Sequence, residues 1–359
     1  MKVTPTLKLG RIRAAPESLA IRDPEATPSR VWSCGLNRTQ SQPNRLFPRA
    51  GPRSETLPIR VLYSIASRYE DLREIACGAM GVVRLVRDTL LNRNVAMKLL
   101  RPEVAGAQPQ VEQLIAEARL TGRLEHPNII PIHECGIDAN GIAYFTMKAV
   151  LGQSLRHWLA DPRRHPGRGS RLTAGLRILL QVCDAVHFAH CQGVIHRDLK
   201  PGNVMVGDDG TVYLIDWGLA RSLGPGDQTT PNAFLESAAF VGTLGYMSPE
   251  AARGEASTCD ERCDVFGLGA IAYEIATGNG PYDGEANWTL WQRARLGEWT
   301  PLDQASPTRN LPERLVGIVR RAMAPRREDR YRFASELKGD IEDFLTRWSR
   351  IPLRESHPG

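Results

Sequence analysis

The chain has 359 residues, 42% of them hydrophobic, which is enough for one large domain or two modest ones. Its net charge of +6 lies in the first 67 residues, where eleven basic residues stand against four acidic ones, and the rest of the chain is close to neutral. This distribution argues against a nucleic-acid partner for the body of the protein. The seven cysteines are scattered without a Cys-x-x-Cys pair, which indicates reduced thiols in a cytoplasmic protein.

The sequence shows no signal that directs the chain to or across a membrane. No stretch approaches the roughly 20 apolar residues that cross a bilayer. The N-terminus carries charges but lacks the apolar core of an export signal. We therefore expect a soluble, cytoplasmic protein without a membrane span, and its oligomeric state stays open.

Residues 1–67 are basic and rich in proline and show no sustained periodicity, so we interpret them as a disordered arm. This arm has two possible roles. It is either a tether to an acidic partner or surface, or a solvated tail, which includes the case of a start site assigned too far upstream. The domain itself is expected at 68–349, followed by a short tail at 350–359.

From Tyr69 onward the chain consists of short runs rich in Val, Leu and Ile, and after Ser154 it becomes mostly helical. Strands are expected at 72–77, 82–88, 94–100, 129–135 and 142–148, and a helix at 110–124. The clearest later helices are expected at 174–192, 262–277, 313–323 and 333–348. This order predicts an α+β, two-lobed architecture: a small antiparallel sheet with one helix at 68–148, and a larger helical lobe at 149–349.

The run His-Arg-Asp-Leu-Lys-Pro-Gly-Asn at 196–203, followed by Asp-Trp-Gly at 216–218, is the most informative motif. It places an acid, a lysine and an asparagine on one short loop, with a second acid just downstream. Such a set can accept the proton of a hydroxyl while it holds magnesium on the phosphates of a nucleotide. A motif of this length with a partner at this spacing rarely arises by chance.

Two features upstream fit a nucleotide site. A glycine-containing loop at 76–83 lies between predicted strands, where free amides can approach phosphates, although a tight hairpin also favours Gly78 and Gly81. Lys98 ends the next strand facing inward and needs an anion or a carboxylate, which Glu117 on the following helix can supply. The alternative is that Lys98 extends to the surface.

From about Tyr69 to Trp348 the chain resembles protein kinases, most closely the bacterial serine/threonine kinases of eukaryotic type. The resemblance implies the bilobal kinase fold and an ATP-dependent phosphotransferase that uses Mg²⁺, with Mn²⁺ as an alternative. It implies that Asp198 orients the acceptor hydroxyl and takes its proton, and that Lys200 stabilises the moving phosphoryl group. It further implies that Asn203 and Asp216 ligate the metal, that Lys98 holds the phosphates, and that Glu117 positions Lys98.

The resemblance also outlines the nucleotide pocket. The phosphate loop contains Ala76, Gly78 and Gly81; the adenine lies between Val83 and Ala96 above and Met205 below; its edge meets the backbone at Lys148 and Val150 after the bulky Met147; and Ser154 contacts the ribose. Lys200 and Thr243 match the serine/threonine version of the site. Protein substrates with Ser or Thr hydroxyls are therefore expected, and the enzyme is expected to act on itself as well.

Several positions have structural or regulatory roles by resemblance. Glu250 is expected to pair with Arg330, and Asp264 to anchor the catalytic loop from beneath. Arg197 suggests control by phosphorylation, with candidates at Thr229, Thr230 and Ser237, unless the segment orders by other contacts. A helix carrying Cys183, His187, His190 and Cys191 could suggest a metal, but four side chains on a straight helix cannot converge on one ion, so we expect core packing.

The sequence departs from the family pattern at Ala76, which replaces a loop glycine, at Trp217, which replaces the usual phenylalanine, and at Thr121, a position that is often apolar. None of these removes a catalytic group. They motivate one alternative, a catalytically silent pseudokinase that acts as a nucleotide-binding scaffold. A kinase for small molecules is a third possibility, but Thr243 and the Ser-Pro-Glu run at 248–250 match a site for an extended peptide.

Overall fold

The computed structural model describes residues 65–78, 81–101, 103–104, 107–138, 140–161, 168–223, 244–255, 258–282, 287–305 and 311–349. The chain divides into two units, residues 1–56 and 57–359, and every described residue belongs to the second unit. The predicted arm before residue 65, the tail at 350–359, Thr243 and the phosphorylation candidates Thr229, Thr230 and Ser237 lie outside the described residues.

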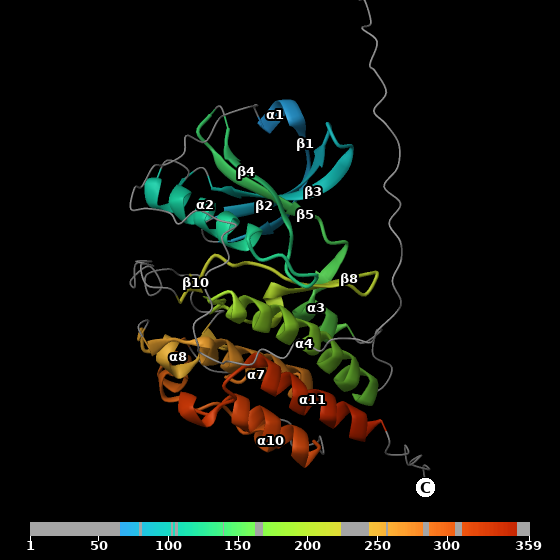
Figure 1. The fold of residues 1–359 in the computed structure, drawn as a ribbon, viewed down its shortest axis with the longest axis vertical. Coiled ribbons are helices and arrows are strands. Elements are labelled where there is room, and N and C mark those ends of the chain that lie inside the picture. Colours follow the sequence, from blue (N-terminus) through green and yellow to red (C-terminus); the bar gives the residue numbers. More distant parts are fainter. Residues whose placement is uncertain are drawn as a thin grey trace, which may run out of the picture. The chain divides into compact units, whose positions relative to one another are not determined.

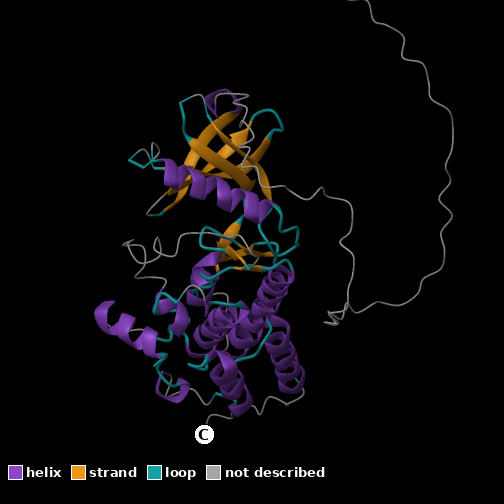
Figure 2. Cartoon of the chain, turned by 60° about the vertical axis from the view of Figure 1, so that its left-hand side comes forward, coloured by secondary structure: helices purple, strands orange, loops and turns teal. Residues whose placement is uncertain are grey.

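The first lobe is built on a five-stranded antiparallel sheet with the strand order β1-β2-β3-β5-β4 (Figure 1). Its elements are α1 (Ile65–Arg68), β1 (Tyr69–Cys77), β2 (Gly81–Asp88), β3 (Arg93–Leu100), α2 (Gln108–Gly122), β4 (Ile132–Ile137) and β5 (Ala143–Lys148). The helix α2 lies across one face of this sheet (Figure 2) and buries Leu114 and Ile115 against Phe145 of β5. The predicted small sheet with one long helix is confirmed.

Two predicted strands differ from the structure at their starts: β1 begins at Tyr69, three residues before the predicted 72, and β4 is shifted along the chain. The sequence indicates a strand at 129–135, whereas β4 begins only at Ile132. The reason is that residues 128–130 bond to β9 of the other lobe: the amide of Leu214 donates to the carbonyl of Asn128, and the amide of Ile130 donates to the carbonyl of Leu214. Apolar periodicity cannot show whether residues 128–130 pair with β5, as β4 does, or with β9, because β5 and β9 are both mostly buried.

The second lobe is mainly helical. Its long helices are α4 (Arg168–Cys191), α7 (Glu261–Thr277), α10 (Glu313–Ala322) and α11 (Ala334–Trp348), and both ends of each lie within one residue of the prediction except the start of α4. The shorter ones are α3 (Leu155–Ala160), α6 (Pro249–Ala252), α8 (Asn287–Leu296) and α9 (Leu302–Ala305), with 3₁₀ turns η2 (Pro201–Asn203) and η4 (Arg327–Asp329). Two small sheets complete it: β6 (Gly152–Ser154), β8 (Val204–Gly207) and β9 (Val212–Leu214), and β7 (Val194–Ile195) with β10 (Arg221–Ser222).

The core of this lobe surrounds α7 and α4. The N-terminus of α7 is capped by Asp260, whose carboxylate accepts from the amide of Arg262, and the helix ends at Gly278 in the left-handed region at φ 86°. Among the described residues, α4 is the single helix that is long and apolar enough to span a membrane, which the sequence analysis did not expect. Its residues Leu176, Leu179 and Val182 are fully buried in the core, so packing accounts for its apolar character.

Candidate active site

The loop at 196–203 connects β7 to β8 and is held from below by one buried carboxylate. Asp264 of α7 accepts hydrogen bonds of 2.8 Å from the backbone amides of His196 and Arg197 and a third of 2.8 Å from Nε2 of His190. Arg197 adopts φ 65°, a left-handed conformation that costs energy in a non-glycine residue. The Asp264 contacts fix this turn, and the predicted anchoring role of Asp264 is confirmed.

The carboxylate of Asp198 is buried and its two oxygens have different surroundings. Oδ2 accepts hydrogen bonds from Nζ of Lys200 at 2.8 Å and from Nδ2 of Asn203 at 2.9 Å. Oδ1 is buried and has no hydrogen-bond partner among the described residues. A buried acceptor without a partner is costly unless a ligand supplies the donor. This geometry leaves one oriented oxygen for a hydroxyl group.

Lys98 of β3 meets two carboxylates from different parts of the chain. Its Nζ lies 2.7 and 2.9 Å from the oxygens of Glu117 on α2, and 3.2 Å from Oδ1 of Asp216. The expected pairing of Lys98 with Glu117 is confirmed. Burial opposes the charged ammonium, but the charges of Asp216 and Glu117 outweigh it and raise the pKa of Lys98. Lys98 therefore remains a cation at neutral pH.

Asp216 and Asn203 form the oxygen donors of a candidate metal site. The amide of Ile215 donates to the carbonyl of Asn203 at 2.9 Å, which places the residue preceding Asp216 beside Asn203. Asp216 adopts φ 62°. Burial opposes its ionised form, but Lys98 lowers its pKa, so the carboxylate is charged. Asn203 uses Nδ2 in its bonds to Asp198, which leaves its carbonyl oxygen Oδ1 for a metal. One carboxylate and one amide oxygen fit Mg²⁺ that also binds phosphates.

The glycines of the predicted phosphate loop differ in what they require. The amide of Gly78 donates to the carbonyl of Gly81 at 2.8 Å and closes a turn, while residues 79 and 80 are not described. A Cβ at Gly81 would lie 2.6 Å from the carbonyl oxygen of Leu99, whereas one at Gly78 has ordinary contacts. Gly81 is therefore required by the packing of β2 on β3, in addition to any role toward phosphates.

The sheet register brings three predicted nucleotide residues into one row. Ala76 of β1 lies opposite Val83 of β2, and Val83 lies opposite Lys98 of β3. Residues directly opposite in antiparallel strands share a face, so these side chains line the same side of the sheet. Ala96 lies two positions before Lys98 in β3 and is buried. Strand pairing thus brings residues that are distant in the sequence to the same side of the sheet.

The segment that joins the lobes shows contacts that sequence reasoning missed. Nζ of Lys148 donates to the hydroxyl of Tyr213 at 2.7 Å, whereas the sequence predicts only a backbone role for this residue. Ser154 is the N-cap of α3 and accepts from the amide of His157. The only sequence signal for this cap is a serine directly before an apolar helical run. The predicted ribose contact of Ser154 stays a prediction.

Trp217 and Thr121, at which the sequence departs from the family pattern, are both buried in the structure. Trp217 is 1% exposed and packs on His196 with ring centroids 4.6 Å apart, but its indole Nε1 has no partner among the described residues. Thr121 is buried and donates to the carbonyl of Glu117 at 2.8 Å within α2. Its hydroxyl is thereby satisfied, so a polar residue at this apolar position carries no buried-donor penalty.

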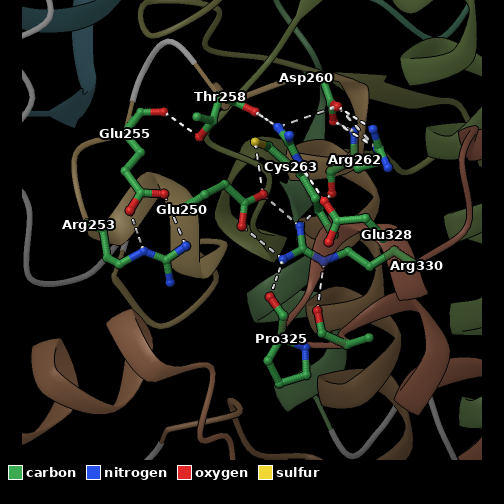
Figure 3. Close-up of polar contacts among 12 residues, drawn as sticks. Glu250, Arg253, Glu255, Thr258, Asp260, Arg262, Cys263, Pro325, Glu328 and Arg330 are labelled. Atoms are coloured by element: carbon green, nitrogen blue, oxygen red, sulfur yellow. Dashed lines mark hydrogen bonds and ion pairs between the residues drawn. The ribbon is translucent and has the colours of Figure 1, made fainter.

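Glu250 and Arg330 form a buried bidentate ion pair of 2.7 and 2.8 Å (Figure 3). Arg330 also donates to the carbonyls of Ala324 and Pro325, and Cys263 contacts Glu250 at 3.2 Å. The predicted pair is confirmed. A pocket of about 410 Å³ opens beside it, lined in part by Arg253 and Arg327. None of Lys98, Asp198 and Asp216 lines this pocket, so it is separate from the site around Asp198.

A family model for the protein kinase domain matches residues 69–339, which is well over half of the chain. The chain belongs to the protein kinase domain family. Of the four residues for which core packing was expected, Cys183 and His190 are buried and confirm it, whereas Cys191 is exposed, so the prediction was wrong for Cys191. His190 bonds Asp264 beneath the catalytic loop.

Two curated proteins similar to this kinase domain come from bacteria. The chain is 37% identical over 287 residues to the probable serine/threonine-protein kinase CE0033 of Corynebacterium efficiens, which covers 78% of this chain and 42% of that protein. It is 34% identical over 285 residues to serine/threonine-protein kinase PknB of Mycolicibacterium smegmatis, covering 77% and 43%. The chain therefore spans about two-fifths of the length of these relatives.

A solved structure agrees with the fold. The kinase domain of Mycobacterium tuberculosis PknI, crystallised as a double mutant, matches with a TM-score of 0.56 and 25% sequence identity. The match covers 77% of this chain and 96% of that chain. The bilobal α+β kinase fold inferred from the sequence is confirmed.

Proposed function

We propose that this domain transfers the γ-phosphoryl group of ATP to serine and threonine hydroxyls of proteins, including its own chain. The observation that carries the proposal is the Asp198 carboxylate, in which Lys200 and Asn203 hold Oδ2 while the buried Oδ1 has no partner among the described residues. A substrate hydroxyl can donate to Oδ1, which orients its oxygen for attack. We assign residues 68–349 as the catalytic unit.

The transfer is balanced as follows. The acceptor oxygen forms a bond to the γ-phosphorus, the bond from this phosphorus to the β–γ bridging oxygen breaks, and the acceptor proton passes to Oδ1 of Asp198. ADP leaves with the electron pair of the broken bond. Lys200, which lies 2.8 Å from Asp198, neutralises the negative charge on the moving phosphoryl group.

Lys98 binds the α- and β-phosphates, and Glu117 holds its ammonium in place. Both carboxylates that contact Lys98 lie within 3.2 Å of Nζ, so a phosphate replaces or joins Asp216 around one preformed cation. Mg²⁺, or Mn²⁺ as a second hard cation, fits Asp216 and Asn203 and when bound neutralises phosphate charge. The adenine lies between Val83 and Ala96 on one side and Met205 on the other, and within the described residues the backbone amide of Val150 has no backbone partner and can bond its edge.

The test is transfer of labelled phosphate from ATP and Mg²⁺ to a generic basic protein, with wild type compared with Asp198→Asn. The substitution keeps the size of the side chain but removes the proton acceptor, so the rate is expected to fall about a thousandfold, or ~4 kcal/mol of barrier. Nucleotide binding without transfer by either protein would instead support the scaffold. Label appearing only on small metabolites would support a small-molecule kinase.

A further inference from the structure

The hinge between the two lobes is held by backbone contacts on both of its sides. On the first side, the amide of Lys148, the last residue of β5, donates to the carbonyl of Pro131 at 3.1 Å. On the second side, the carbonyl of Leu151 accepts from the amide of Asp208 at 2.8 Å, and β6 begins at the next residue. Only residues 149 and 150 lie between these two sets of contacts.

The side chain of Lys148 crosses this short gap. Its Nζ donates to the hydroxyl of Tyr213 at 2.7 Å and lies 4.8 Å from the centre of the Tyr213 ring. Tyr213 belongs to β9 in the second lobe and is 9% exposed. A hydrogen bond and a cation–π contact therefore connect the last residue of the sheet lobe with the body of the other lobe.

Tyr213 also adjoins the predicted floor of the adenine site. In the small sheet, Tyr213 lies opposite Met205 of β8, and Met205 lies opposite Ser154 of β6. Directly opposed residues share a face, so the three side chains form one row. Three positions after Tyr213 the chain reaches Asp216. The Lys148–Tyr213 contact is thus adjacent both to the hinge and to the strand that supports the nucleotide.

We propose that the Lys148–Tyr213 pair is a positioning pair that sets nucleotide affinity. It fixes the separation of the lobes at the hinge and the position of the strand below Met205, so that the adenine slot is formed before the nucleotide binds. A site that is organised in advance spends less binding energy on ordering itself. This inference rests on the proposed function, since it assigns a role in binding ATP.

The experiment compares Tyr213→Phe, Lys148→Met and the double variant with wild type. Each single variant removes the hydrogen bond with little change in volume. The net effect of one such bond predicts a three- to tenfold rise in KM for ATP and in Kd for Mg·ADP measured by calorimetry. KM and Kd of the double variant should be no higher than those of the single variant that binds nucleotide more weakly, because both substitutions remove the same contact. KM for the protein substrate and kcat should change less than twofold.

Tyr331→Phe is the matched control, because it removes a buried tyrosine hydroxyl bonded to Asp340 at 2.6 Å, away from the hinge. It should leave KM for ATP unchanged, whatever its effect on thermal stability. An active wild type whose KM and Kd are unchanged in both single variants would overturn the role of the pair while leaving the proposed function intact. A wild type that neither binds nor transfers phosphate would overturn both.

Discussion

At the scale of residues, each charged group of the site is balanced by very few partners. Lys98 is the single described cation in contact with both Glu117 and Asp216, and Glu117 is the more buried of the two carboxylates. Burial raises the pKa of Glu117, which makes its charged form dependent on Lys98. Removing Lys98 therefore leaves the buried Glu117 without its cationic partner, whereas Lys98 retains Asp216 when Glu117 is removed.

Glu117→Gln tests this dependence. The amide keeps the shape of the side chain but replaces a charged hydrogen bond with a neutral one, which is weaker by about 1–2 kcal/mol. We expect kcat/KM for ATP to fall about 10-fold and the Tm to fall slightly. Steady-state kinetics at varied ATP give the value. Glu112→Gln on the exposed side of the same helix is the control, and equal losses in both variants would contradict the assigned role.

At the scale of elements, the short helix α6 is fixed by one ion pair rather than by its length. It has four residues, too few to be stable alone. The side chain of Arg330 is fully buried and that of Glu250 is 5% exposed, and the pair connects α6 with the turn η4. Burial opposes ionisation of Glu250, but the hydrogen bonds from Arg330 outweigh it and hold the pKa of Glu250 below its usual 4.5.

The pH dependence of stability follows from this lowered pKa. A carboxyl group with a depressed folded-state pKa stabilises the fold above its unfolded pKa and loses that contribution as the pH falls through the folded value. Glu250→Gln should therefore lower the free energy of unfolding by about 3–5 kcal/mol at pH 7. The difference between variant and wild type should shrink below pH 4.5. Urea unfolding at pH 7, 5 and 3.5 measures it, and a difference that does not vary with pH would contradict the prediction.

At the scale of the whole molecule, Arg68 lies at the N-terminal boundary of the domain and makes contacts that the fold needs. Its guanidinium bonds both oxygens of Asp88, at 3.2 and 3.0 Å, and pairs with Glu134 on another strand. Asp88 is fully buried and also accepts hydrogen bonds from the amides of Leu90 and Leu91. The side chain of Arg68 thus ties the start of the domain to β2 and β4, and its backbone carbonyl also accepts from the amide of Thr89 at 2.9 Å.

Deletion of residues 1–64 tests the proposed boundary. We expect thermal stability and phosphate transfer to stay within twofold of the full chain, because Arg68 and every described element remain. The same truncation with Arg68→Met strands the Asp88 carboxylate and should cost about 3 kcal/mol of stability. Loss of transfer in the simple truncation would show that the basic arm has an essential role.

The sequence alone determined the chemistry, because the residues of the 196–203 and 216–218 motifs are close in the chain and their identities state what each can do. It also determined the long helices: the apolar periodicity of α10 and α11 matches burial on one side, and the nearly continuous apolar run of α7 matches its burial on almost all sides. Pairings across long separations could only come from the tertiary structure. Three such features have no local signal in the sequence: the contact of Lys148 with Tyr213, the contact of His190 with Asp264, and the absence of Ile129 from β4. Each depends on which strands and helices meet.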